Sequence, residues 1–382
     1  MHGPFSAIIA GDKKSISYRG NNIFPPEEDV SDAKFINQEA KSHLDKIAFD
    51  NHLYHLHKID NGIFFATVEY FKKINAEWCN LPLTTLMVSS PGEVYAGKKL
   101  DYTTDTLPVS LSWFGNTREV FLSESSQFYL ELRLLSEKID KVFSIYSSFR
   151  KEKADFTHLS EFQHIEFEGK VSFSENIDIA IGLMRHIVFY LIRNHNDSLL
   201  FFLSKKESEE LQNVFSQESF TTITFTEALV MLYEDTKDER YKKFSMENFG
   251  SWQEIRLTEL AGKHIIVTEF PLLQMPFYHN TASRSRNGHA VAENADIILY
   301  GFRETVGSGV RITDKKDLLR KAEIFNLPKD DYEPYLMIRD YEHYKRTAGF
   351  GMGWQRFTQW LLKLPYIWES AHVPRGHHLP NI

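Results

Sequence analysis

Apolar residues recur at helical spacing in three stretches of the sequence. The first covers residues 40–74, with an expected break at Asn61 and Gly62, because both residues disfavour a helix interior. The second covers residues 123–135. The third begins near Ser174 and ends near Asn194, and one face of it carries Ile177, Ile181, Met184, Val188 and Leu191. Residues 205–260 are also expected to be mainly helical, although they are highly charged.

Short apolar runs bounded by polar residues predict strands between these helices. We expect strands over residues 81–88, 109–114, 120–122, 221–225, 264–268 and 295–300. Residues 142–168 are expected to form a β-hairpin, and residues 349–362 a strand that leads into a helix. A loop-rich lead-in is expected before residue 40, and a polar loop over residues 281–288. Separated strands with helices among them favour an α+β fold around a mostly antiparallel sheet, in one domain.

The composition narrows the class of protein. Of the 382 residues, 42% are hydrophobic and 25% are charged, as in globular proteins. The formal net charge of -8 argues against broad binding to DNA or other nucleic acids, which depends on neutralising phosphates. The single cysteine, Cys79, can form no internal disulfide. The N-terminus has no basic signal region, and the most apolar stretch, residues 177–192, is too short to span a membrane. We therefore expect a cytoplasmic protein.

The predicted hairpin at residues 142–168 carries an unusual set of charges. Arg150 ends the first strand with Glu152 two positions on, and Glu166 and Glu168 share one face of the second strand. An arginine held by a carboxylate presents a fixed set of donors to an anion. Carboxylates gathered on one sheet face repel one another unless a cation or a ligand ammonium group lies between them. Taken alone, the pattern fits a solvent-exposed strand slightly better than a ligand site.

Two further segments carry candidate chemistry. Asp296 and Glu304 lie at the two ends of an apolar strand, where they could reach a divalent ion that bridges phosphates. Ser125 and Gln127 lie at a helix start, where such residues either cap the helix or bind a ligand, and capping is the default interpretation. His52, His55 and His57 match no usual zinc spacing, so surface positions are expected for them.

In their order along the chain, these segments resemble the catalytic domain of class II aminoacyl-tRNA synthetases, in the asparaginyl/aspartyl branch, from about residue 40 to residue 375. The resemblance implies the class II antiparallel sheet flanked by helices, and ATP and Mg²⁺ as cofactors. Arg150 and Arg356 would be catalytic, on the α- and γ-phosphates, and Asp296 with Glu304 would hold the metal. The implied ATP-binding residues are Arg150, Glu152, His158, Glu304, Gly351, Gly353 and Arg356.

The same resemblance implies an amino-acid site and a dimer. Residues 89–93 are similar to a mobile loop of the family that closes over the amino acid. The implied amino-acid-binding residues are Glu93, Ser125, Gln127, Glu131, Glu166 and Arg311. Pro82 and the apolar helix before it resemble motif 1, which implies a symmetric homodimer.

Departures from the family pattern shape the expected function. Residues 149–162 resemble the family's motif 2, and residues 351–356 resemble its motif 3. Thr157 stands where motif 2 usually has an arginine, and Gln355 replaces the motif 3 glutamate. Leu130 stands where aspartyl enzymes have a lysine, which favours an asparagine-type pocket. Residues 1–39 are too few for the family's β-barrel anticodon-binding domain, so residues 40–382 are expected to be the catalytic domain.

We therefore expect an AMP-forming ligase that makes an aminoacyl-adenylate and transfers it to ammonia or a small amine. The alternatives are a genuine asparagine or aspartate tRNA ligase, for which tRNA would be a partner, and a non-catalytic binding paralogue.

Overall fold

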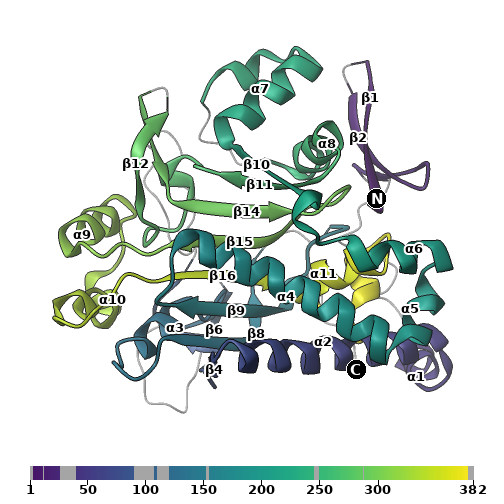
Figure 1. Ribbon diagram of the computed structural model, residues 1–382, viewed down its shortest axis with the longest axis horizontal. Helices are drawn as coiled ribbons and strands as arrows, with labels where there is room; N and C mark the ends of the chain where they lie inside the picture. Colours follow the sequence, from purple (N-terminus) through teal and green to yellow (C-terminus); the bar gives the residue numbers. More distant parts are fainter. Residues whose placement is uncertain are drawn as a thin grey trace.

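The computed structural model describes residues 3–11, 13–25, 40–89, 107–109, 120–151, 155–244, 249–286 and 288–376. Its centre is a sheet in the order β10-β11-β14-β15-β16-β9-β8-β4 (Figure 1). Neighbouring strands are antiparallel except for the pairs β10–β11 and β4–β8. The α+β fold expected from the sequence is therefore confirmed. The strands are β4 (Glu77–Trp78), β8 (Lys141–Phe149), β9 (Glu161–Gly169), β10 (Phe220–Thr224), β11 (His264–Thr268), β14 (Asn294–Ile298), β15 (Glu304–Val310) and β16 (Ala348–Gly353).

Two long helices, α2 (Asn51–Lys73) and α4 (Phe173–Asn194), run along one side of this sheet (Figure 1). They lie so close that a Cβ added to Gly62 would be 2.3 Å from Leu191 Cδ2. Gly62 therefore allows the two helices to touch, and the break predicted at Asn61 and Gly62 is wrong. The break occurs instead at Asp50, which caps α2 by accepting a hydrogen bond from the His52 N–H at 2.7 Å.

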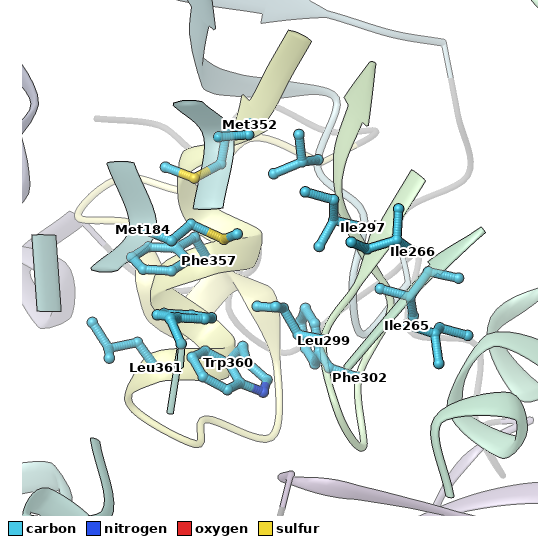
Figure 2. Packing of buried hydrophobic residues seen from close by; sticks show 14 of the residues in the cluster. Met184, Ile265, Ile266, Ile297, Leu299, Phe302, Met352, Phe357, Trp360 and Leu361 are labelled. Carbon is cyan, nitrogen blue, oxygen red and sulfur yellow. The ribbon is translucent and has the colours of Figure 1, made fainter. Parts of the chain in front are cut away.

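Side chains from the sheet, from α4 and from helix α11 (Trp354–Leu361) fill the core between them. In Figure 2, Met184 of α4 and Phe357 and Trp360 of α11 face Ile297 and Met352 of the sheet. The amphipathic pattern predicted at residues 174–194 thus covers the sheet as expected, and the helix is capped by Ser172. Because α11 begins directly after β16, this packing fixes the orientation of the glycine-rich strand that precedes it.

The N-terminal residues form strands that the sequence analysis missed. A three-stranded antiparallel sheet consists of β1 (Phe5–Ala10), β2 (Lys13–Tyr18) and β3 (Asn21–Phe24). The Phe5 N–H donates to the Gly301 carbonyl at 3.1 Å, and the Phe5 ring lies 5.6 Å from that of Phe302. The loop-rich interpretation of this segment is therefore wrong, because one face of the small sheet joins the main core. The division at residue 39 stays a prediction.

Other predicted bounds also change. The run at residues 81–88 contains only the short strand β5 (Thr84–Thr85), and the helix predicted from residue 123 begins later, as α3 (Gln127–Arg133). Within the loop predicted at residues 281–288, residues 281–286 form β12 (Thr281–Arg286), which pairs with β13 (His289–Ala292). Most of the strand predicted at 109–114 falls outside the described residues.

The remaining elements are β6 (Leu107–Val109), β7 (Val120–Leu122), α1 (Ala40–Phe49), α5 (Asn196–Phe202), α6 (Lys205–Glu210), α7 (Phe225–Thr236), α8 (Ser251–Ala261), α9 (Lys315–Ile324) and α10 (Lys329–Met337). Among the described helices, none has both the length and the apolar character needed to cross a membrane.

Candidate active site

Four central strands form the floor of a cavity of about 360 Å³. Adjacent strands bring Glu166 of β9 opposite Gly351 of β16, Gly351 opposite Gly307 of β15, and Gly307 opposite Asp296 of β14. A carboxylate thus lies at each end of this row, with two glycines between them. Because glycine has no side chain, the backbone at Gly351 is open to a ligand. At Gly307 the Glu304 carboxylate takes up this space, since it lies 2.8 Å from where a Cβ would be. A smaller cavity of about 60 Å³ adjoins the first and shares Arg150, His158, Gly351 and Arg356 with it.

The arginine predicted at the strand–helix junction, Arg356, lies in the first turn of α11 and lines both cavities. Its Nη2 donates to His158 Nε2 at 2.8 Å, and its Nη1 donates to the Glu304 carbonyl at 3.0 Å. His158 is held from the other side, because its Nδ1 lies 2.8 Å from Asp155 Oδ1. The geometry therefore assigns a neutral imidazole that donates from Nδ1 and accepts at Nε2. Burial lowers the pKa of His158, and the charges of the neighbouring arginines lower it further, against the hydrogen bond to Asp155.

Arg150 follows β8 and lines both cavities, as the sequence predicts for a phosphate-facing residue. Its guanidinium carbon lies 5.7 Å from the centre of the Phe162 ring. Its charge also reaches the cavity floor. Burial lowers the pKa of His164 well below its ordinary value, and Arg150 adds to that effect. Arg150 therefore contributes positive charge where Glu166 and Gly351 form the floor. Glu152, its predicted partner, falls outside the described residues.

Asp296 and Glu304, the predicted metal ligands, both line the larger cavity. Burial raises the pKa of Asp296 well above its ordinary value, and the neighbouring carboxylates of Glu304 and Glu254 raise it further. A cation placed between such carboxylates would relieve this repulsion, so the donor set fits a hard divalent ion such as Mg²⁺. In the described ranges, no group of three or more histidine, cysteine or acidic residues is arranged to hold a metal by itself. Any ion here would need further oxygen ligands from a bound molecule.

Ser125, Gln127 and Glu166 meet at the other end of the cavity. The Ser125 and Ser126 hydroxyls and the Ser126 N–H all donate to Glu166, the last at 2.7 Å. Glu166 is 1% exposed. Burial raises its pKa, although these hydrogen bonds and the charge of Arg150 oppose the rise. The Gln127 amide oxygen accepts from the Tyr278 hydroxyl at 3.0 Å, so the helix start binds side chains across the cavity rather than only capping itself.

Arg311 lies behind Gln127, is 1% exposed and is not itself among the residues that line the cavity. Its Nη2 donates to Glu168 Oε2 at 2.7 Å and to Gln127 Oε1 at 3.2 Å. Its Nη1 is buried and has no hydrogen-bond partner within the part of the chain that the structure describes. A buried guanidinium nitrogen without an acceptor is costly, so a ligand oxygen is the natural partner for it.

Two predictions about these acids are corrected by the structure. The solvent-exposed alternative for the hairpin is wrong, because Glu166 and Glu168 are both buried. Glu131, predicted to bind the amino acid, accepts hydrogen bonds from Tyr335 at 2.5 Å and Tyr344 at 2.6 Å and pairs with Arg339 at 2.7 Å. These contacts commit the Glu131 carboxylate to the core beside α10, and Glu131 is not among the residues that line the cavity. Glu93, predicted for the same site, falls outside the described residues.

The cavity also contains residues that the sequence analysis did not select: His164, Glu254, Tyr278 and Arg303. Arg303 directly precedes Glu304, which the family resemblance already marked. Glu254 belongs to α8, where no sequence pattern distinguishes it from the surrounding charged residues.

Comparisons with known proteins agree on one family. The family model described as tRNA synthetases class II (D, K and N) matches residues 101–376. The asparagine–tRNA ligase of Malacoplasma penetrans is 27% identical over 334 residues, which cover 84% of this chain and 69% of the relative. The asparagine–tRNA ligase of Thermoplasma acidophilum is 26% identical over 360 residues, which cover 94% of this chain and 76% of the relative.

Solved structures show the same fold. The asparaginyl-tRNA synthetase of Pyrococcus horikoshii complexed with asparaginyl-adenylate aligns with a TM-score of 0.75 and 22% identity, over 95% of this chain and 77% of that chain. The enzyme of Entamoeba histolytica in complex with asparaginyl-adenylate gives a TM-score of 0.71 and 20% identity, over 98% and 83%. Members of this family are ATP-dependent, AMP-forming ligases, so the expected enzyme class is confirmed. With a family model that spans most of its length and a cavity floor that brings both arginines together with the paired carboxylates, the chain belongs to the class II tRNA synthetases of the D, K and N group.

Proposed function

We propose that this chain activates asparagine with ATP to form asparaginyl-adenylate, and then transfers the asparaginyl group to tRNA. The observation that carries the proposal is the row across the sheet from Glu166 through Gly351 and Gly307 to Asp296. Arg150, Arg303 and Arg356 line the cavity over this row, which we call the trough, and Ser125, Gln127 and Glu166 gather at its β9 end. A triphosphate suits the first set, and the charged amino end of a substrate suits the second.

Activation requires little covalent chemistry from the protein. A carboxylate oxygen of the amino acid attacks the α-phosphorus, a new P–O bond forms, and the bond to the β-phosphate oxygen breaks as pyrophosphate leaves. Arg150 would stabilise charge on the α-phosphate and Arg356 charge on the γ-phosphate, so positioning and electrostatics supply the rate. Asp296 and Glu304 would hold Mg²⁺, which when bound neutralises charge on the phosphates.

The smaller cavity offers a place for the base of ATP. Its walls include the Phe162 ring and the apolar side chains of Leu159 and Ile367. Arg150 and Arg356 line the same cavity. Aromatic rings and guanidinium groups both stack on flat aromatic bases, so a base fits between one of each. Adenine in this position would direct its phosphates toward the trough.

The charge balance at Arg311 supports a neutral side chain in the substrate. Glu168 already neutralises the Arg311 guanidinium at 2.7 Å, so an aspartate carboxylate would add an unbalanced buried charge. A carboxamide oxygen could instead accept from the unpartnered Nη1 of Arg311 at no such cost. Ser125, Gln127 and Glu166 would bind the α-ammonium end, as the family resemblance implies.

The comparisons change the expected acceptor. Ammonia or a small amine is the acceptor expected from the sequence. The relatives described above are named asparagine–tRNA ligases, and neither they nor the fold give support to a tRNA-independent ligase. We therefore place transfer to tRNA first. The arrangement of Arg150, Arg356, Asp296 and Glu304 around one cavity also speaks against a purely non-catalytic paralogue. A cytoplasmic location stays a prediction.

A homodimer forms part of the proposal. The exposed side of α2 and the segment that follows it present apolar residues with high exposed fractions: Phe64 (44%), Phe65 (53%), Trp78 (60%) and Leu83 (44%). Several large apolar side chains exposed on one segment point to a protein–protein interface if they form one patch. A second copy of the chain, related by a two-fold axis, would cover it.

Pyrophosphate exchange measured with each standard amino acid tests activation directly. We expect asparagine-dependent exchange of label between pyrophosphate and ATP without tRNA, and stable charging when tRNA is added. The acceptor is decided in a second assay in which ammonia replaces tRNA. Asparagine-dependent exchange with AMP and an amide as products, and no charged tRNA, would support the tRNA-independent ligase instead. Absence of exchange with every amino acid would contradict activation itself.

A further inference from the structure

The turn between β14 and β15 places a third arginine beside the site. Arg303 is 7% exposed and lines the larger cavity. Its Nε donates to Glu254 Oε2 at 2.9 Å, and its Nη1 donates to Thr157 Oγ1 at 3.0 Å. Glu254 Oε2 also accepts from the Glu304 N–H at 3.1 Å. Arg303 is therefore fixed in orientation by α8 on one side and by Thr157 on the other.

Arg303 and Arg356 converge on the same imidazole nitrogen. Arg356 Nη2 lies 2.8 Å and Arg303 Nη1 3.3 Å from His158 Nε2. Thr157 joins the two arginines as well, since its hydroxyl accepts from Arg303 and its carbonyl accepts from Arg356 Nε at 3.3 Å. A neutral imidazole offers one lone pair to two cationic groups. Glu254 offsets the charge of Arg303, and Asp155 lies on the other side of His158. An anion here would therefore be bound by the directed N–H donors of the two guanidinium groups rather than by an unbalanced charge.

The field around His158 supports this interpretation. Burial is the largest cause of its lowered pKa, and the charges of Arg303 and Arg356 both lower it further although Asp155 opposes them. Positive charge at this end of the cavity thus comes from the β14–β15 turn and from α11. The side chain of Thr157, where the sequence analysis noted a missing arginine, is short enough to leave room for the Arg303 guanidinium.

We propose that Arg303 binds the terminal phosphates of ATP together with Arg356, so that a pair of arginines on either side of His158 grips the leaving pyrophosphate. The inference rests on the proposed function for the identity of the nucleotide. Glu254 is a positioning residue in this arrangement, because it orients Arg303 by accepting from its Nε. The role is specific to the β- and γ-phosphates, because Arg303 lies beside Arg356 at the end of the cavity assigned to them.

The experiment compares equilibrium binding of ATP and AMP, measured by calorimetry without any amino acid. Arg303→Gln combined with Glu254→Gln removes both charges of the buried pair and leaves neither one unpaired. We expect the double variant to lose ATP affinity by about tenfold or more, the usual effect of one charge-assisted phosphate contact. Affinity for AMP, which lacks the terminal phosphates, should stay close to that of the unmodified protein. Arg303→Lys should retain more ATP affinity than the double variant, because it keeps the charge.

A matched control comes from the same helix as Glu254. Arg256 pairs with Asp235 and Glu259 and does not line either cavity. Arg256→Gln removes a comparable paired charge and should leave ATP and AMP affinity unchanged. A purely structural role for Arg303 predicts either equal losses of ATP and AMP affinity or a lower melting temperature with unchanged ATP affinity, and both results would overturn the proposal.

The outcome separates this inference from the proposed function. Selective loss of ATP affinity in the double variant, with no amino acid supporting exchange, would support Arg303 as a phosphate ligand and contradict activation. Normal exchange in the double variant, with ATP affinity unchanged, would overturn the role of Arg303 and leave activation intact.

Discussion

Arg356 Nη2 donates a hydrogen bond to His158 Nε2 at 2.8 Å, across the junction of two segments far apart in the sequence. The bond requires a neutral imidazole, since a protonated ring has no acceptor. It therefore fixes the Arg356 guanidinium in position before any nucleotide binds. Such preorganisation is what charge stabilisation in a transition state requires, because the donors need not reorganise during the reaction.

Removing either predicted catalytic arginine should abolish activation without unfolding the chain. Arg150→Ala and Arg356→Ala each delete a charge-assisted phosphate contact worth about 2–3 kcal/mol or more, so we expect pyrophosphate exchange to fall at least about thirtyfold. Both side chains lie at the cavity rather than in the apolar core. Circular dichroism and thermal melting should therefore stay close to those of the unmodified protein. Exchange at an unchanged rate in either folded variant would refute the assigned role.

Alanine at two glycines of β16 should change different properties: ATP binding at Gly351 and the stability of the fold at Gly349. A Cβ at Gly351 would meet Gln127 Nε2 and Glu166 Oε1 at 3.6 Å, which is ordinary contact. Gly351→Ala should therefore fold but place a methyl group in the trough and weaken ATP binding. A Cβ at Gly349 would lie 2.5 Å from the Phe167 carbonyl oxygen, which belongs to the adjacent strand. Gly349→Ala should destabilise the sheet itself by more than about 1 kcal/mol.

Thermal melting and ATP titration of the two variants check this contrast. Normal ATP affinity in Gly351→Ala would show that the trough is not the nucleotide site or is wider than the structure indicates. An unchanged melting temperature in Gly349→Ala would show that β9 and β16 pack less closely there than the structure indicates.

The parts of the fold that the sequence predicts well are those whose signal is local. The hairpin predicted at residues 142–168 is found as β8 and β9, because alternating side chains fix its register. The three N-terminal strands were missed because only one face of that small sheet is covered, and β1 alternates buried and exposed residues over its first half only. Gly62 was misjudged for a related reason: its role depends on a second helix, α4, that the local pattern does not contain.

The same distinction between local and distant signals applies to the residues of the site. Family motifs selected Arg150, Asp296 and Arg356, and the structure gathers all three at one cavity. The contacts of Glu131 could not be predicted from its motif, because the spacing of residues along a helix does not indicate which side chains of α10 will pack against it. Arg303 could not be selected at all from the sequence, because its significance arises only where the β14–β15 turn meets Thr157 and α8.

The exposed apolar surface of α2 leads to a prediction about assembly. Light scattering at micromolar concentration should show a dimer, and Phe65→Asp should convert it to a monomer by placing a charge in the interface. Val230→Asp is the control, because Val230 is a similarly exposed apolar residue (50%, against 53% for Phe65) of α7, which lies at the opposite edge of the sheet from α2 (Figure 1). A monomeric unmodified protein, or equal effects of both substitutions, would contradict the motif 1 interface.

Buried His264 should make stability depend on pH. Its Nε2 lies 3.0 Å from the Val214 carbonyl oxygen, and its Nδ1 accepts from the Tyr300 N–H at 2.9 Å, so the ring is neutral. Burial lowers the pKa of His264 from 6.5 to about 4. The unfolded chain binds this proton more tightly than the folded chain does, so the stabilisation of the fold by the neutral His264 ring is fully present above pH 6.5. This stabilisation is lost as the pH falls toward 4, in total by about 3 kcal/mol.

Urea unfolding between these pH values measures this effect. His264→Gln can keep both hydrogen bonds without titrating, so its free energy of unfolding should fall less steeply as the pH decreases. The other buried histidines, such as His158, still titrate in the variant and account for the remaining slope. An unchanged slope in His264→Gln would mean that His264 is not held neutral in the fold.

The pairing of Arg311 with Glu168 leads to a prediction about substrate choice. Glu168→Gln leaves the Arg311 guanidinium with a net positive charge in a buried site, where a negatively charged side chain would be attracted to it. We expect the ratio of kcat/KM for aspartate to that for asparagine, measured by pyrophosphate exchange, to rise by about tenfold or more, equivalent to at least about 1.4 kcal/mol. Glu168→Asp is the matched control, because it keeps the negative charge and should leave the ratio close to that of the unmodified protein. A rise of the same size in both variants would show that the shape of the site, and not its charge balance, excludes aspartate.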